Sequence, residues 1–135
     1  MDTPERRIAI VDDEPSLCRA LTRLLRLNGF AVDAFASGEE FLESLPERTP
    51  SCLILDLQMP GLTGLDVLGR LSAVRSSIPV VTITGYDSPS ARERAIAGGA
   101  SDYLRKPVGE EALLAAIERC TNARPAGATG ARSDP

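Results

Sequence analysis

The chain has 135 residues, with 15 basic and 19 acidic side chains, no histidine and a formal net charge of −4 at neutral pH. The length suits one domain, and the lack of histidine excludes a histidine-activated nucleophile, histidine zinc ligands and a phosphohistidine within this chain. The acidic balance and the 4% aromatic content argue against nucleic-acid binding by this domain, and no apolar run approaches the roughly 18 residues that cross a bilayer, so no membrane partner is expected.

Short apolar runs alternate along the chain with segments whose apolar residues recur at helical spacing. The predicted strands are 7–11, 30–35, 52–56, 78–83 and 103–104. The predicted helices are 15–27, 37–45, a third marked by Leu65, Leu68 and Leu71, then 88–97 and 110–120. Five repeats of strand and helix predict a doubly wound (βα)5 α/β fold, in which a five-stranded parallel sheet is covered by helices on both faces.

Polar residues mark the starts of two of these helices. Pro15 suits the first turn of a helix, with a preceding carboxylate as its cap. Ser37 and Glu40 have the spacing of a capping box. These signals predict helices that begin near residues 15 and 37.

The three cysteines, Cys18, Cys52 and Cys120, form no CxxC pair and lie in apolar contexts. An odd number of cysteines without metal-ligand spacing is typical of small buried residues in a reduced protein. The polar start of the chain has no signal-peptide pattern. We therefore expect a cytoplasmic protein.

Polar residues follow four of the predicted strands. Asp12 and Asp13 follow the first strand, Asp56 ends the third, Thr84 ends the fourth and Lys106 follows the fifth. In an open parallel sheet the carboxyl ends of the strands share one edge, where ligands bind. Three carboxylates, a hydroxyl and an ammonium are therefore expected to converge there.

This set of groups has a definite chemistry. Three close carboxylates repel one another, and Mg²⁺ prefers a few such ligands together with water and phosphate oxygens. An ammonium from Lys106 and a hydroxyl from Thr84 would neutralise and orient a phosphoryl group. Asp56 is the best candidate for the nucleophile, because it stands alone at the end of a central apolar strand.

Each residue also has a simpler interpretation when it is taken alone. Asp12 and Asp13 could only cap a helix, Asp56 could be a solvated strand end, and Thr84 and Tyr103 could be ordinary strand residues. What argues for a site is that all of them occur together at strand ends.

Four motifs that contain these residues resemble the receiver domain of two-component response regulators. They are Val11-Asp12-Asp13-Glu14-Pro15, Leu55-Asp56-Leu57-Gln58-Met59-Pro60-Gly61 with Gly64 following, Thr82-Ile83-Thr84-Gly85 and Tyr103-Leu104-Arg105-Lys106-Pro107. The resemblance implies the flavodoxin-like strand order 2-1-3-4-5 of chemotaxis regulators. It implies a receiver domain over residues 5–121, followed by a disordered tail or the start of an interdomain linker over 122–135.

The resemblance also implies individual roles. Asp56 would be the phosphoacceptor. Asp13, Asp56 and the backbone carbonyl of Gln58 would bind Mg²⁺ directly, with Asp12 acting through water. Lys106 would hold the phosphoryl group, with a cis peptide bond before Pro107.

Two further pairs of residues take roles by the same resemblance. Thr84 and Tyr103 would form the switch, in which Thr84 moves to the phosphoryl group and the Tyr103 ring fills the space it leaves. Gln58 and Tyr86 would tune hydrolysis of the acyl phosphate by positioning or excluding water.

The expected function is that of a switch. A sensor histidine kinase or a histidine phosphotransfer protein would donate the phosphoryl group, and the surface of the fourth helix, fifth strand and fifth helix would change in response. The domain would catalyse only its own phosphorylation and dephosphorylation, so it is not expected to be an enzyme. Phosphorylation-dependent homodimerisation is possible, and the output would be transcription in a longer helix-turn-helix regulator or protein contact in a single-domain one.

Two alternatives use the same residues differently. A degenerate receiver would act as a docking module without phosphorylation, although the complete set from Asp12 to Lys106 argues against it. A Mg²⁺-dependent phosphatase with an aspartyl intermediate would place its nucleophile after the first strand, with a second Asp two residues later, whereas Asp12 and Asp13 are adjacent here.

Overall fold

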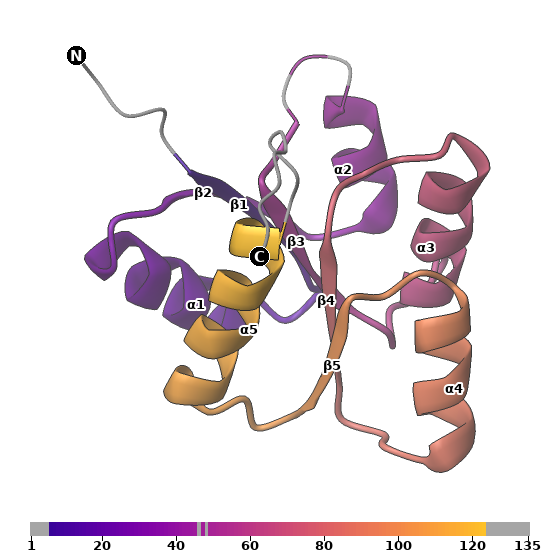
Figure 1. Cartoon of the computed structure of the whole chain (residues 1–135). Helices are drawn as coiled ribbons and strands as arrows, with labels where there is room; N and C mark the ends of the chain where they lie inside the picture. Colours follow the sequence, from indigo (N-terminus) through magenta and orange to yellow (C-terminus); the bar gives the residue numbers. More distant parts are fainter. Residues whose placement is uncertain (1–5, 46, 48, 124–135) are drawn as a thin grey trace.

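The computed structural model describes residues 6–45, 47 and 49–123, in which five strands alternate with five helices (Figure 1). The elements are β1 Arg7–Val11, α1 Pro15–Leu27, β2 Ala31–Phe35, α2 Gly38–Ser44, β3 Cys52–Asp56, α3 Gly64–Ala73, β4 Val80–Thr84, α4 Pro89–Ala97, β5 Asp102–Arg105 and α5 Glu110–Ala123. α5 runs three residues beyond its predicted end, because no glycine or proline follows Cys120 before Pro125. The rest of the predicted tail, 124–135, lies outside the described residues.

The strands form one parallel sheet in the order β2-β1-β3-β4-β5. This confirms the predicted doubly wound fold and its strand order. β1 and β3 are neighbours with Val11 opposite Leu55, and β3 and β4 are neighbours with Asp56 opposite Ile83. The register therefore brings the carboxyl ends of the three central strands to the same edge.

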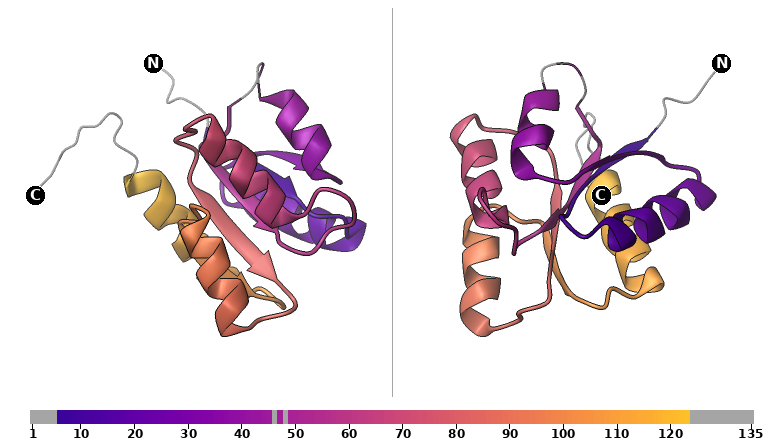
Figure 2. Two further views of the ribbon diagram at one scale, coloured as in Figure 1. Left: turned by 90° about the vertical axis from the view of Figure 1, so that its right-hand side faces the viewer. Right: turned by 180° about the vertical axis from the view of Figure 1, so that it is seen from behind.

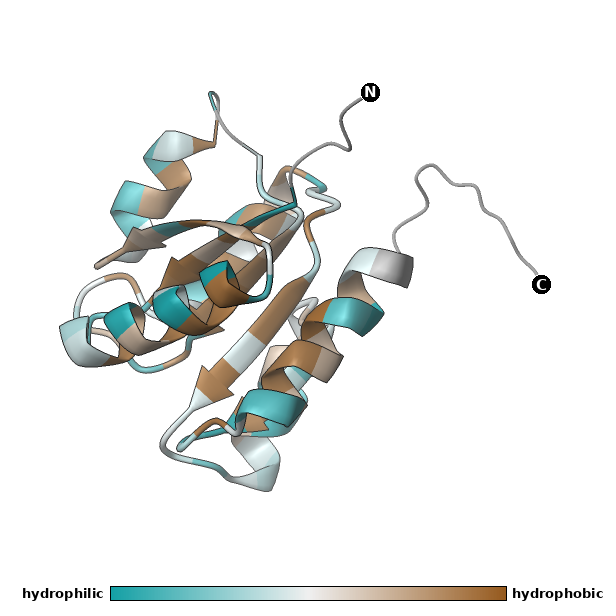
Figure 3. Ribbon diagram, turned by 90° about the vertical axis from the view of Figure 1, so that its left-hand side faces the viewer, coloured by the Kyte–Doolittle hydropathy of each residue, from teal (hydrophilic) through white to brown (hydrophobic). Residues whose placement is uncertain are grey.

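Helices cover both faces of the sheet, as the alternation predicted (Figure 2). α1 and α5 pack on one face, where Ile8 and Ile10 of β1 join the apolar side chains of these two helices. α2, α3 and α4 pack on the other face, against Ala9, Val11 and their neighbours. Figure 3 shows hydrophobic colouring along the central strands, whereas the helices carry both hydrophobic and hydrophilic residues. The apolar side chains thus form two separate cores, one on each face of the sheet.

The helix starts differ in detail from the prediction. Glu14 occupies the N-cap of α1, but its side chain makes no capping hydrogen bond. Instead Oδ1 of Asp12 accepts the Glu14 backbone N–H at 2.9 Å, so the carboxylate that orders this turn lies two residues further back. Ser37 caps α2 by accepting the Glu40 N–H, as predicted, but Glu40 turns back to Ala36 rather than to Ser37.

Candidate functional site

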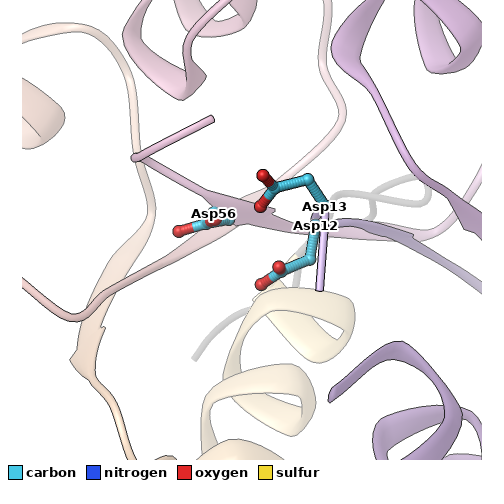
Figure 4. A group of neighbouring side chains, drawn as sticks. All are labelled: Asp12, Asp13 and Asp56. Atoms are coloured by element: carbon cyan, nitrogen blue, oxygen red, sulfur yellow. The ribbon is translucent and has the colours of Figure 1, made fainter. Parts of the chain in front are cut away.

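Three carboxylates meet where β1 and β3 end side by side (Figure 4). One ligand oxygen from each of Asp12, Asp13 and Asp56 lies within 4.8 Å of the other two. Asp56 ends β3, and the two others follow β1 directly. The strand pairing places them together, as the sequence predicted from their positions at strand ends.

Two of the three carboxylates are withdrawn from water. Asp12 is 1% exposed and Asp56 is 2% exposed. Oδ2 of Asp12 is buried and accepts no hydrogen bond from the described part of the chain, although the Lys106 ammonium lies 3.1 Å away as an ion-pair partner. A buried carboxylate oxygen without a hydrogen bond, among three carboxylates, suits a hard divalent cation such as Mg²⁺. These residues therefore fit the metal that the resemblance implies.

Lys106 supplies the opposite charge. It follows β5, and its Nζ reaches back across the end of β4 to Asp12 at 3.1 Å, to Oε1 of Glu14 at 2.9 Å and to Oδ1 of Asp56 at 3.6 Å. The peptide bond between Lys106 and Pro107 is cis, as expected. The ammonium of Lys106 is thus shared among Asp12 and Glu14, which follow β1, and Asp56, which ends β3.

The surroundings of the site raise the pKa values of both Asp56 and Lys106. Burial, followed by the nearby charge of Asp12, raises the pKa of Asp56 to about 6, although Lys106 opposes this. Burial disfavours the charged form of Lys106, but its hydrogen bond to Glu14, its close pairing with Asp12 and the charge of Asp56 outweigh it and raise the pKa of the ammonium. Near neutral pH the lysine is therefore charged, and Asp56 takes up a proton at a higher pH than an exposed aspartate does.

Thr84 ends β4 next to these groups and is fully buried. Its hydroxyl donates to the side-chain carbonyl Oε1 of Gln58 and accepts the backbone N–H of Tyr86 at 3.0 Å. The backbone N–H of Gln58 in turn donates to Oδ1 of Asp56 at 3.2 Å. Gln58 therefore touches both Asp56 and Thr84, although the sequence singled it out only through the family resemblance.

A cavity of about 400 Å³ opens over the site. It is lined by Asp13, Glu14, Asp56, Gln58, Gly85, Tyr86 and Lys106. The Tyr86 side chain lies at its rim and is 75% exposed. A small charged group that enters this cavity would meet both Asp56 and Lys106.

Tyr103 lies on β5 with its ring buried, away from the carboxylate cluster. Its hydroxyl donates to Oδ1 of Asp87 at 2.9 Å, and the Arg92 guanidinium lies 5.5 Å from the ring centre. Asp87 also forms an ion pair with Arg105 at 3.8 Å. The structure thus links Tyr103 to the loop after Thr84 through a residue that sequence reasoning did not identify, since a carboxylate one position before the Ser88 cap has no motif of its own.

The loop between β3 and α3 depends on one glycine. A Cβ at Gly64 would lie 2.3 Å from the carbonyl oxygen of Asp56 and 2.6 Å from Cα of Leu57. The Gly64 N–H donates to the Leu57 carbonyl at 3.2 Å, and Thr63 with Asp66 forms a capping box that starts α3. The chain therefore turns back close beneath Asp56, and only glycine fits at position 64.

The sequence profile of the response regulator receiver domain family matches residues 8–118. The chain is 41% identical over 114 residues to nodulation protein W of Bradyrhizobium diazoefficiens, an alignment that covers 84% of this chain and 50% of that protein. It is 38% identical over 125 residues to the response regulator protein TmoT of Ectopseudomonas mendocina, covering 93% and 57% of the two chains. The chain thus spans about half the length of these relatives.

Solved structures agree with this assignment. The crystal structure of FixJ-N superposes with a TM-score of 0.83 at 33% identity, covering 90% of this chain and 98% of that one. The chain belongs to the response regulator receiver domain family of two-component systems. Among the described residues, no helix is both long and apolar enough to cross a membrane.

Proposed function

We propose that this domain accepts a phosphoryl group on Asp56 in a Mg²⁺-dependent reaction and changes its α4-β5-α5 surface in response. The observation that carries the proposal is the convergence of Asp12, Asp13 and Asp56 with the Lys106 ammonium at one edge of the sheet. The donor would be the phosphohistidine of a sensor histidine kinase or of a histidine phosphotransfer protein, since this chain contains no histidine.

In the proposed transfer, a carboxylate oxygen of Asp56 attacks phosphorus. A new P–O bond forms while the P–N bond of the donor breaks, and the imidazole nitrogen keeps the electron pair. The Gln58 N–H already donates to Oδ1 of Asp56 and so fixes one oxygen of the nucleophile. Such a transfer needs charge neutralisation and in-line positioning, with little covalent work from the protein.

Charge neutralisation would come from two sources. Lys106, now 3.6 Å from Oδ1 of Asp56, would pair with a phosphoryl oxygen. Asp12, Asp13, Asp56 and the Gln58 carbonyl would hold Mg²⁺, which when bound neutralises the carboxylates and the phosphoryl oxygens. Tyr86 at the rim of the cavity would shield the acyl phosphate from water, and Gln58 would help to set its lifetime.

The switch would use Thr84 and Tyr103. The Thr84 hydroxyl would turn to a phosphoryl oxygen, and the Tyr103 ring would move into the space it leaves. Because the Tyr103 hydroxyl is hydrogen-bonded to Asp87 in the loop before α4, this movement would reposition α4 and β5. The domain acts on its own phosphoryl group only, so we regard it as a switch and not as an enzyme.

Intact-mass spectrometry after incubation with acetyl phosphate and MgCl₂ tests the proposal. We expect a single phosphoryl adduct on the wild type, and none on Asp56→Asn or in excess chelator. Asp66→Asn, which changes an exposed carboxylate on α3, is the matched control and should be labelled like the wild type.

A wild type that binds Mg²⁺ but takes no phosphoryl group from acetyl phosphate or from a phosphohistidine donor would support the phosphorylation-independent docking module instead. Rapid turnover of an unrelated phosphomonoester would support the phosphatase alternative.

Size-exclusion chromatography of the phosphorylated and free forms tests homodimerisation. The output would be transcription or protein contact. Which of the two it is would depend on the partner or further domain that binds the α4-β5-α5 surface.

A further inference from the structure

The Thr84 hydroxyl makes two hydrogen bonds in this structure. It accepts the Tyr86 backbone N–H at 3.0 Å and donates its only proton to Oε1 of Gln58. A hydroxyl has two lone pairs but a single proton, and the side-chain carbonyl of Gln58 accepts that proton. While this bond exists, Thr84 has no proton to offer a phosphoryl oxygen.

Gln58 is well placed to hold Thr84. Its backbone N–H donates to Oδ1 of Asp56 at 3.2 Å, so the main chain is anchored on the proposed nucleophile while the side chain reaches across to β4. The side chain also lines the cavity over Asp56. The same residue therefore contacts the proposed nucleophile and the proposed switch hydroxyl.

We propose that the Gln58 side chain is a latch, which holds the Thr84 hydroxyl in its resting arrangement and must release it before Thr84 can bind a phosphoryl oxygen. This inference rests on the proposed function, since it concerns the regulation of the same site. Gln58 is then a positioning residue that acts through Thr84. Its side-chain carbonyl stabilises the resting state and so opposes the phosphorylated one.

The size of the effect follows from the ordinary strength of such a bond. A neutral hydrogen bond contributes about 0.5–1.5 kcal/mol net, which corresponds to a change of about 2- to 10-fold in an equilibrium constant. Removing the acceptor should shift the resting equilibrium toward a free Thr84 hydroxyl by this factor. The factor should vanish when Thr84 has no hydroxyl.

The test uses Gln58→Met, which keeps an unbranched side chain of similar length and removes the carbonyl. Gln58 is exposed, so the substitution leaves both cores intact. Affinity for beryllium trifluoride, a tetrahedral mimic of an acyl phosphate, is measured by titration calorimetry in the presence of MgCl₂. The same measurement on the wild type, on Thr84→Val and on Gln58→Met/Thr84→Val completes a double-mutant cycle.

We expect Gln58→Met to bind the mimic about 2- to 10-fold more tightly than the wild type. In the Thr84→Val background the same substitution should have no effect. The backbone amide of Tyr86 gives a second readout without any ligand, because it reports the Thr84 hydroxyl directly. Its NMR signal should move in Gln58→Met toward its position in the mimic-bound wild type.

Equal affinity of Gln58→Met and wild type for the mimic, or an equal effect of the substitution with and without the Thr84 hydroxyl, overturns the latch. Failure of the wild type to bind the mimic or to form an acetyl phosphate adduct overturns the proposed function instead. In that case the Tyr86 amide still decides whether Gln58 holds Thr84: an unmoved signal in Gln58→Met shows that it does not.

Discussion

Tyr103 donates its phenolic proton to Oδ1 of Asp87 at 2.9 Å, and this bond joins β5 to the loop between β4 and α4. That loop begins immediately after Thr84, whose hydroxyl accepts the N–H of Tyr86 in the same loop. Two side chains from neighbouring strands therefore hold one short segment, each by a single hydrogen bond. Both hydrogen bonds therefore connect a strand to the segment that precedes α4.

We predict that Asp87→Asn lowers the pKa of the Tyr103 hydroxyl. Burial raises this pKa first, and the hydrogen bond and negative charge of Asp87 raise it further. The substitution removes the charge and leaves the burial, so the pKa should fall but stay above its ordinary value. The chain has two tyrosines, so alkaline spectrophotometric titration in a Tyr86→Phe background follows Tyr103 alone.

The matched control is Glu93→Gln, which removes a carboxylate from an exposed position on α4. It should leave the Tyr103 titration unchanged. A Tyr103 pKa that is the same with and without the Asp87 carboxylate would contradict the assignment of this bond.

Asp56 should make the metal-free protein less stable as pH rises. Its pKa in the folded state is about 6, above the ordinary value of 3.8. The folded state therefore holds the Asp56 proton more tightly than the unfolded state does. This stabilises the fold fully below about pH 4, and the stabilisation is lost as pH rises through 6. Because the folded-state pKa of about 6 lies well above 3.8, the unfolding free energy of Asp56→Asn relative to the wild type should rise by about 3 kcal/mol between pH 4 and pH 8.

Urea unfolding at several pH values in a chelator measures this difference. Asp66→Asn is the informative comparison, because hydrogen bonds with Thr63 lower the pKa of Asp66. A lowered pKa stabilises the fold above the unfolded value, so that variant should lose stability relative to the wild type as pH rises. A gap between Asp56→Asn and wild type that does not change with pH would refute the raised pKa.

Gly64→Ala should damage the site through the backbone. The added methyl group would lie 2.3 Å from the Asp56 carbonyl oxygen, and backbone atoms cannot move aside without shifting β3 or the loop. We expect a loss of about 1–3 kcal/mol in unfolding free energy, together with weaker Mg²⁺ binding.

Gly69→Ala in the middle of α3 is the control. No atom lies within 4 Å of its Cβ position, and alanine favours a helix over glycine, so stability should rise by about 0.5–1 kcal/mol. The two variants, compared by chemical unfolding and by calorimetry with MgCl₂, separate a local clash from a general effect of alanine. Normal stability of Gly64→Ala would show that the loop can relax.

Mg²⁺ should stabilise the domain by binding the three carboxylates. At a concentration ten times Kd, a ligand that binds only the folded state adds about 1.4 kcal/mol. Thermal unfolding with and without MgCl₂ should show this gain in the wild type and a much smaller one in Asp13→Asn, which removes the one exposed member of the cluster.

Glu43→Gln, an exposed change on α2, should retain the full stabilisation by Mg²⁺. If Asp13→Asn were stabilised by the metal as strongly as this control, the metal would bind elsewhere.

Much of this domain was predictable from the sequence. Continuous apolar strands such as 52–56, separated by amphipathic helices, require a parallel sheet with two covered faces, because each strand must bury both of its sides. Parallel strands also share one direction, so polar residues at their carboxyl ends must meet. The gathering of Asp12, Asp13, Asp56 and Lys106 follows from that geometry, and the structure places them together.

Only the tertiary structure decided which side chains bind one another at that edge. Three interactions each join segments that are separate in the sequence: the hydrogen bond from Thr84 to Gln58, the hydrogen bond from Tyr103 to Asp87, and the ion pair of Lys106 with Glu14. Their existence depends on strand register and on side-chain rotamers, which no local sequence pattern encodes. The sequence determined which chemical groups reach the site, and the packing of the two cores determined which of them hold each other at rest.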